Sequence, residues 1–389
     1  MLINRSLGYY KVDNLEFDSK ILACIHANKF NKQVEWVFNN DTFGTYNWTI
    51  EPSETLDQLY DRRSRELREK YDYLIISYSG GADSHNIVES FLRQGLHIDE
   101  LLINTMSEGN GNFMTVSEDN KSSQNAAASE HILQTIPRLK EIQNRSPKTK
   151  ITEVDLTKFL FSFFDSHGDA SWIESKREGL NPLNVTRYNY LYFSEVRKKF
   201  DKDKKIAIVV GVEKPRTYIH SVTNEFYVRF NDRAANIASV NDFVKDYPNS
   251  TVEYFYWSPD AVDIICKQSH VIKKWLEINP QYKPLWTGTA LSKEMFRLVH
   301  ERVLRTLIYT TWDDRWYQAD KSTKDWHSEF DTWFIQGHAG SKSHAIWLEG
   351  LKYVETNASN FINRKENLAD GLIMFNQDYR IGSMSPINI

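Results

Sequence analysis

Short apolar runs alternate with amphipathic segments through the middle of the chain, a pattern typical of an α/β protein. The clearest run, 73–78, is followed by apolar residues at helical spacing within 82–94. Further apolar runs predict strands at 98–104, 150–155 and 204–211. The segments between them predict helices at 123–142, 156–164 and 187–200. Because strands that alternate with helices usually pair in parallel, we predict a doubly wound parallel sheet with ligands at the carboxyl ends of its strands.

The flanking segments have a different texture. Residues 1–50 are predicted to be β-rich, with strands at 20–25 and 34–38, and a helix is predicted from Pro52 to Lys70. After Tyr218 the pattern predicts short β-like pieces and then helices, at 225–230, 251–257, 260–277 and 292–309. We therefore expect three units: a β-rich N-terminal extension with its helix, a central α/β domain, and a mainly helical, Trp-rich C-terminal region. Their expected limits are 1–70, 71–232 and 233–389.

The turn after the first strand carries the strongest chemical signal, the run Ser79-Gly-Gly-Ala-Asp-Ser84. Gly80 and Gly81 permit positive φ angles and place no side chain in the path of an anion. A helix that starts directly after the turn directs its first backbone N–H groups at the same point. The serine hydroxyls add donors, and Asp83 suggests Mg²⁺, which prefers carboxylate and phosphate oxygens. The turn therefore predicts a phosphate site.

This run matches the SGGxDS signature of the PP-loop ATP pyrophosphatases and resembles their N-type group, which includes asparagine, GMP and NAD synthetases. The resemblance implies an adenine nucleotide alpha hydrolase-like fold and an enzyme that cleaves ATP between its α and β phosphates. It also implies that the pyrophosphate lies against Ser79, Gly80, Gly81 and Ser84, with Asp83 at the magnesium ion or organising the loop. No G-x-x-x-x-G-K-[ST] or G-x-G-x-x-G motif competes with this interpretation.

Two other strand ends are predicted to contribute to the site. The adenosine end of the nucleotide is expected along the second strand, near Ile103, Asn104 and Thr105. The strand at 204–211 is followed by Lys214 and Arg216, two cations on the expected ligand side. Such cations bind phosphate or carboxylate and neutralise the charge that develops during phosphoryl transfer. A surface turn with two solvated cations is the alternative. A polar segment at 105–121 is either a lid over the site or an exposed insertion.

Within the family, residues 61–100 look closest to the synthetase domain of asparagine synthetase, and the resemblance weakens beyond about residue 215. The expected reaction is adenylation of a carboxyl or carbonyl oxygen, followed by displacement of AMP by ammonia or an amine. Position 2 is Leu, so no N-terminal cysteine of a glutaminase is present, and a separate ammonia or amine donor or a separate glutaminase is implied. A second hypothesis is an adenylase that modifies a nucleobase, tRNA or DNA by amidation or thiolation. Some phage genomes encode stand-alone PP-loop proteins of this general kind. A non-catalytic nucleotide-binding partner subunit is the third hypothesis.

Composition narrows these classes. The net charge of −4 gives no support for non-specific nucleic-acid binding, although a local basic groove remains open. The two cysteines, Cys24 and Cys266, lie far apart, which excludes a Cys-rich zinc or iron–sulfur site and fits a reducing cytoplasm, a host's if the chain is phage-encoded. No run of 18 apolar residues predicts a membrane span, and the N-terminus has no signal-peptide pattern. We therefore expect a cytoplasmic protein.

Overall fold

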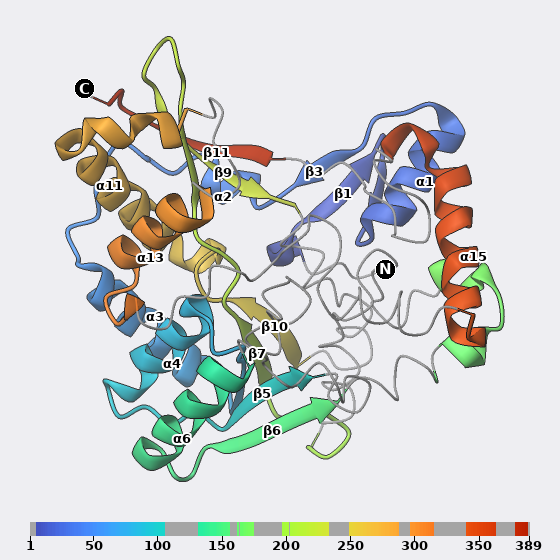
Figure 1. The fold of residues 1–389 in the computed structure, drawn as a ribbon, viewed down its shortest axis with the longest axis horizontal. Helices are drawn as coiled ribbons and strands as arrows, with labels where there is room; N and C mark the ends of the chain where they lie inside the picture. Colours follow the sequence, from blue (N-terminus) through green and yellow to red (C-terminus); the bar gives the residue numbers. More distant parts are fainter. Residues whose placement is uncertain are drawn as a thin grey trace, which may run out of the picture.

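A five-stranded parallel sheet forms the centre of the molecule (Figure 1). The computed structural model describes residues 5–105, 131–155, 162, 164–174, 197–201, 203–232, 249–287, 296–314, 340–362 and 378–387. The sheet strands are β4 (Tyr73–Ser77), β5 (Glu100–Thr105), β6 (Lys150–Asp155), β7 (Ile206–Val210) and β10 (Ser250–Tyr254). Every pairing between neighbours is parallel. The α/β class and the parallel sheet predicted from the sequence are thus confirmed.

The order of the strands determines where a ligand can bind. Across the sheet the order is β10-β7-β4-β5-β6. From β4 the chain first adds β5 and β6 on one side and later adds β7 and β10 on the other. The order therefore reverses between β4 and β7, and in open α/β sheets ligands bind at such a point, at the carboxyl ends of the strands. The interior of β4 and all five residues of β7 are buried, which fits their apolar sequences.

The helices around this sheet largely follow the sequence prediction. They are α3 (Leu56–Lys70), α4 (Ala82–Leu92), α6 (Ile136–Arg145), α11 (Val262–Ile278) and α13 (Arg302–Ile308). Two π-helical segments precede α6 and α13, namely η3 (His131–Thr135) and η7 (Phe296–Glu301). Helix α3 begins at a capping box in which Thr55 and Gln58 satisfy each other's backbone N–H groups. The polar segment at 105–121, predicted as either a lid or an exposed insertion, lies outside the described residues except for Thr105. So do residues 123–130 of the helix predicted at 123–142 and most of the helices predicted at 156–164 and 187–200.

The N-terminal part corrects one prediction. Strands β1 (Tyr9–Val12), β2 (Leu15–Phe17) and β3 (Glu35–Val37) form a small antiparallel sheet. Residues 20–25, predicted as a strand, instead lie in α1 (Lys20–Phe30), and α2 (Asn40–Phe43) follows. The Ser19 hydroxyl caps α1 by accepting from Leu22 N, and Asn31 ends it in the left-handed region. The apolar run is too short for its period to distinguish a helix from a strand. The Ser19 cap favours the helix.

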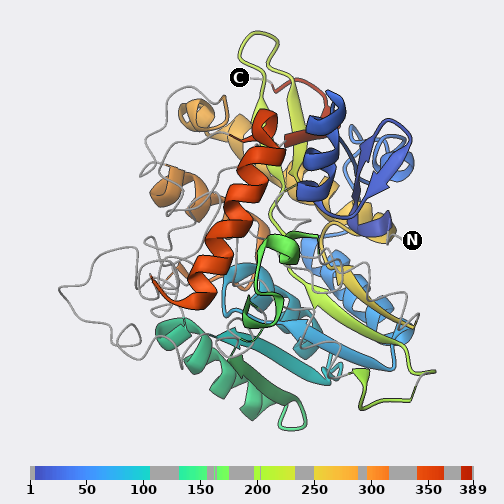
Figure 2. The same cartoon turned by 90° about the vertical axis from the view of Figure 1, so that its right-hand side faces the viewer.

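A third sheet joins distant parts of the chain. It consists of β8 (Arg216–Ile219), β9 (Phe226–Asn231) and β11 (Asp378–Met384), in the order β11-β9-β8. Helix α15 (Lys342–Asn357) packs beside α1, as Figure 2 shows. The region after 232, predicted to be mainly helical, thus also supplies β10 to the central sheet and β11 to this one. Short 3-10 helices complete the described part: η1 (Arg5–Leu7), η4 (Ala170–Ile173), η5 (Pro259–Ala261), η6 (Pro280–Leu285) and η9 (Ser359–Phe361).

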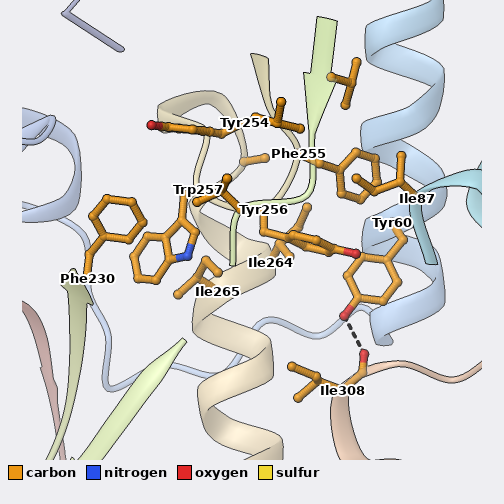
Figure 3. Packing of buried hydrophobic residues seen from close by; sticks show 14 of the residues in the cluster. Tyr60, Ile87, Phe230, Tyr254, Phe255, Tyr256, Trp257, Ile264, Ile265 and Ile308 are labelled. Atoms are coloured by element: carbon orange, nitrogen blue, oxygen red, sulfur yellow. Dashed lines mark hydrogen bonds between the residues drawn. The ribbon is translucent and has the colours of Figure 1, made fainter. Parts of the chain in front are cut away.

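Aromatic side chains fill the space between the sheets. Figure 3 shows Trp257 packed against Phe230, whose ring centroids are 4.5 Å apart. On the other side of the same segment, Tyr256 lies beside Tyr60 of α3. The Tyr60 hydroxyl donates a 2.6 Å hydrogen bond to the carbonyl of Ile308, the last residue of α13. This bond fixes the end of α13 relative to α3. No helix among the described residues is long and apolar enough to cross a membrane.

Candidate functional site

The glycine turn links the end of β4 to the start of α4. Gly81 is the residue before the helix and no side chain caps it. The first backbone N–H groups of a helix have no intrahelical acceptor, and a helix N-terminus is therefore a position where anions bind. The Ser84 hydroxyl accepts a 3.2 Å hydrogen bond from Ser79 N and lies 3.3 Å from Gly81 O, to which it donates. The serines therefore also hold the shape of the turn.

Gly80 is essential to this shape for two reasons. Its φ of +75° is a left-handed conformation that residues with a Cβ rarely adopt. A Cβ at this position would also lie only 2.6 Å from Thr135 Oγ1 and 2.8 Å from Thr135 Cα. Thr135 ends η3, and its hydroxyl donates a 2.8 Å hydrogen bond to Ser79 O. Arg138, at the start of α6, donates to Gly80 O. The turn is thus held from one side by the η3–α6 segment.

The carboxyl end of β7 approaches the turn from the other side. A Cβ at Gly211 would lie 3.1 Å from the Asp83 carbonyl carbon and 3.2 Å from Ser84 N. The absence of a side chain at Gly211 therefore allows β7 to meet the first turn of α4. This contact places the loop after β7, which carries Lys214, beside the glycine turn.

Asp83 and Lys214 meet at this point, as the sequence predicts. The Lys214 ammonium lies 3.5 Å from Asp83 Oδ1, and the Tyr309 hydroxyl donates to the same carboxylate oxygen. The Tyr256 hydroxyl donates a 2.8 Å hydrogen bond to the Asp83 carbonyl. Burial, and then the charge of Asp83, raise the pKa of Tyr309 well above its ordinary value, so its hydroxyl stays protonated and remains a donor.

Lys214 lies between two carboxylates. Its side chain is 13% exposed, and its ammonium is also 3.5 Å from Glu301 Oε2. Burial alone would lower the pKa of Lys214, but Asp83 and Glu301 together outweigh burial and raise it. Glu301 in turn contacts Arg305 at 3.7 Å. Burial would raise the pKa of Glu301, whereas Lys214 and Arg305 lower it, so this carboxyl is ionised. The lysine is a fixed positive charge beside the glycine turn.

Arg216 does not join this cluster. It begins β8, and its Nε donates a 3.1 Å hydrogen bond to Glu213. The predicted adenosine-side residues lie at the carboxyl end of β5, the strand next to β4. Ile103 is buried in the core, and Asn104 and Thr105 pair with Val154 and Asp155 of β6. Thr105 Oγ1 is buried and accepts or donates no hydrogen bond among the described residues, which leaves a polar atom for a ligand at this edge.

The donor set fits magnesium only when the ion arrives with phosphate. The described residues hold no cluster of three or more His, Cys, Asp or Glu that would bind a metal. Asp83 is the one carboxylate at the turn that the sequence predicts as a ligand, and Lys214 lies 3.5 Å from it. Magnesium commonly binds through one or two carboxylates plus substrate phosphates. These residues fit that mode, with Asp83 as the protein ligand.

Sequence reasoning missed several residues that surround the turn. They are Thr135, Arg138, Tyr256, Glu301 and Tyr309. The one available signal was at Tyr256, which lies in the β-like segment predicted at 251–257. This region contains the fifth parallel strand, β10, which ends at Tyr254. Had 251–257 been assigned to the central sheet, its carboxyl end would have been predicted to lie at the site. The others come from segments without a local motif.

Comparisons with known proteins do not identify the chain. No protein-family model matches the sequence, and a search of curated proteins returns no match. The geometry of the turn and the residues that surround it are therefore the basis for inferring a function.

Proposed function

We propose that the protein is an ATP pyrophosphatase that adenylates a substrate oxygen and releases pyrophosphate. One observation carries the proposal: the turn at 79–84 leads into the N-terminus of α4, which has no side-chain cap, next to the point where the strand order reverses. Backbone N–H groups at such a point bind linked phosphates, and Lys214 adds a charge at the same place. The finer fold that goes with this proposal is the doubly wound, adenine nucleotide alpha hydrolase-like arrangement.

The residues of the site divide the work of such a reaction. A carboxyl or carbonyl oxygen of the substrate attacks the α-phosphorus, and the bond to the β-phosphate oxygen breaks, so that pyrophosphate leaves. The N–H groups of 80–84 would bind the pyrophosphate, and Lys214 would neutralise the charge that develops on it. Glu301 and Tyr309 hold Lys214 and Asp83 in position. A bound magnesium ion would supply further charge neutralisation at the phosphates.

The second half-reaction is displacement of AMP. Ammonia or an amine would attack the adenylated carbon, forming an amide or amidine-type bond and releasing AMP, as in an asparagine synthetase-like enzyme without a glutaminase domain. The nucleophile would then be free, or would come from a separate protein. The turn supports the proposed use of ATP and Mg²⁺, whereas it leaves the identity of the substrate oxygen open.

Replacement of Lys214 tests this assignment against a matched control. Lys214→Met should lower ATP–pyrophosphate exchange, measured with candidate acids and Mg²⁺, by about a hundredfold or more, because a buried charge at the leaving group is lost. Lys267→Met is the control. Its side chain is similarly exposed, at 14%, and is paired with Glu51 away from the turn. Asp83→Asn and Ser84→Ala should also lower exchange.

The products decide between this reaction and its rivals. Chromatography of the nucleotides should show AMP and pyrophosphate. Formation of ADP and phosphate would contradict the proposal, and so would exchange that survives both Asp83→Asn and Lys214→Met. If no AMP forms with any candidate while ATP still binds, the non-catalytic nucleotide-binding function replaces it.

A further inference from the structure

Three arginines lie side by side across the sheet β11-β9-β8. Arg229 in the central strand is directly opposite Arg216 on one side and Arg380 on the other. Directly opposed residues of antiparallel strands point to the same face, and like charges in that position are destabilising. The row therefore places three positive charges on one face of the sheet.

The outer arginines have carboxylate partners, whereas the central one has none within the part of the chain that the structure describes. Arg216 contacts Glu213 at 3.1 Å, and Arg380 contacts Glu225. Arg229 makes no ion pair among the described residues; its guanidinium donates a 3.0 Å hydrogen bond to the Tyr227 hydroxyl. Its Nε is buried and has no hydrogen-bond partner in that part of the chain. A guanidinium at the centre of a positive row, with no carboxylate partner among the described residues, is suited to bind an anion.

Two tyrosines complete this face. Tyr218 and Tyr227 are also directly opposite each other, and their rings are 5.9 Å apart with planes at 17°. The Arg229 guanidinium lies 4.6 Å from one ring centroid and 4.8 Å from the other. Arg380 lies 5.2 Å from the ring of Tyr227. We call these five residues the arginine–tyrosine face: Arg216, Tyr218, Tyr227, Arg229 and Arg380.

The face is accessible and close to the glycine turn. Burial alternates along β8 and β9, so that residues of the face are half-buried while their neighbours fill the core. Arg380 is 51% exposed. Arg216 follows Lys214 by two positions, so their Cα atoms are at most about 7 Å apart. The face therefore begins two residues from Lys214 of the proposed site.

We propose that the arginine–tyrosine face binds the backbone of a single-stranded nucleic acid. Strands are spaced about 4.8 Å apart, so the row spans about 10 Å, which is wider than one phosphate group and favours a chain of phosphates over a mononucleotide. Surfaces that bind single-stranded nucleic acid commonly combine arginines with aromatic rings. The proposed binding does not depend on the proposed function. The further idea that the bound strand presents a nucleobase for adenylation does rest on the proposed function.

Oligonucleotide binding without ATP tests the proposal. Fluorescence anisotropy with labelled single strands of about 15 nucleotides, DNA and RNA in separate arms, should show saturable binding that weakens with salt. Arg229→Gln should weaken binding about tenfold and lower the slope of log K against log salt by about 0.7, one phosphate contact on a single strand. Arg65→Gln is the control, because it removes the same charge from an exposed position on α3 and should leave binding unchanged.

Each alternative result has a defined meaning. The proposal is overturned if the wild-type protein binds no single strand saturably, if Arg229→Gln and Arg65→Gln weaken binding equally, or if ATP at the same phosphate concentration displaces the strand fully. Should Arg229→Gln melt at a markedly lower temperature, the exposed Arg380→Gln provides the same comparison and is expected to weaken binding in the same direction. If the wild-type protein shows no ATP–pyrophosphate exchange but still binds single strands, the adenylation proposal is refuted and the nucleic-acid-binding proposal stands.

Discussion

At the scale of single residues, the site depends on contacts that fix a few atoms rather than on many charges. Asp83 Oδ1 accepts from Tyr309 and also faces Lys214, so one carboxylate oxygen joins the turn to two other segments. Tyr60 holds the carbonyl of Ile308 and thereby positions Tyr309. Lys214 keeps its charge through two carboxylates despite its burial. These contacts preorganise positive charge where a phosphate chain would lie.

Gly80 offers a residue-scale prediction with an internal control. Gly80 and Gly95 both have positive φ angles, +75° and +67°, but only Gly80 has atoms where a Cβ would be, whereas the space around Gly95 is open. Gly95→Ala should lower the free energy of unfolding by about 1 kcal/mol, from backbone strain alone. Gly80→Ala should lower it by about 3 kcal/mol, because Thr135 must also move. Urea unfolding measures both, and equal losses would show that the turn does not pack on η3 as described.

At the scale of elements, the two π-helical segments each end at a residue that contacts the site. Thr135 ends η3 and binds the turn, and Glu301 ends η7 and binds Lys214. Such segments often occur at functional positions, because the extra residue redirects side chains that a regular helix would place elsewhere. The Asp83–Lys214 pair therefore lies between two elements with local departures from α-helical geometry.

His300, on η7, gives this element a pH-dependent stability. Burial, with a contribution from Lys214, lowers the pKa of His300 to about 4, although Glu301 opposes the shift. The unfolded chain has a histidine pKa of about 6.5, so it binds more protons than the folded protein between these values. The free energy of unfolding should therefore fall as the pH falls from about 6.5, with a loss of about 3 kcal/mol from this group at pH 4. Urea unfolding of wild type and His300→Gln at pH 7 and pH 4 measures that share.

The two proteins should differ in slope and not only in stability. The wild-type protein is expected to lose more stability than His300→Gln between the two pH values, because the variant lacks the buried group that must take up a proton. Parallel losses would mean that His300 is not held neutral at η7, and the packing of its ring on Trp286, at 4.4 Å between centroids, would then be wrong.

The elements also show how much of the structure could be predicted from the sequence. Strands β4, β5 and β7 were predictable because a strand that is buried on both faces has a largely continuous apolar sequence. Helix α1 was not, since its apolar residues satisfy either period over so short a stretch. Of the site, Asp83 and Lys214 were predicted from strand ends and a turn motif. Thr135, Glu301 and Tyr309 contact residues between 56 and 226 positions away in the chain, so no local pattern indicates them.

At the scale of the whole molecule, the chain returns repeatedly to the same edge of the central sheet. Tyr256, just after β10, and Tyr309, just after α13, come from beyond residue 249, yet both donate hydrogen bonds to Asp83 in the turn at 79–84. Arg63 of α3 is 2% exposed and meets Glu253 of β10 at 3.0 Å, which ties the helix before the turn to the fifth strand. A buried pair of this kind is strongly destabilising to break, so these distant segments fold together.

The proposed function requires that the turn at 79–84 binds the linked phosphates of ATP. The most direct measurement is a crystal structure of the protein with Mg²⁺ and α,β-methylene-ATP, an analogue that cannot be cleaved between its α and β phosphates. We predict phosphate oxygens within hydrogen-bond distance, about 3 Å, of the backbone nitrogens of 80–84, and Lys214 Nζ beside the same group. Analogue bound elsewhere, or none at saturating concentration, would contradict the account.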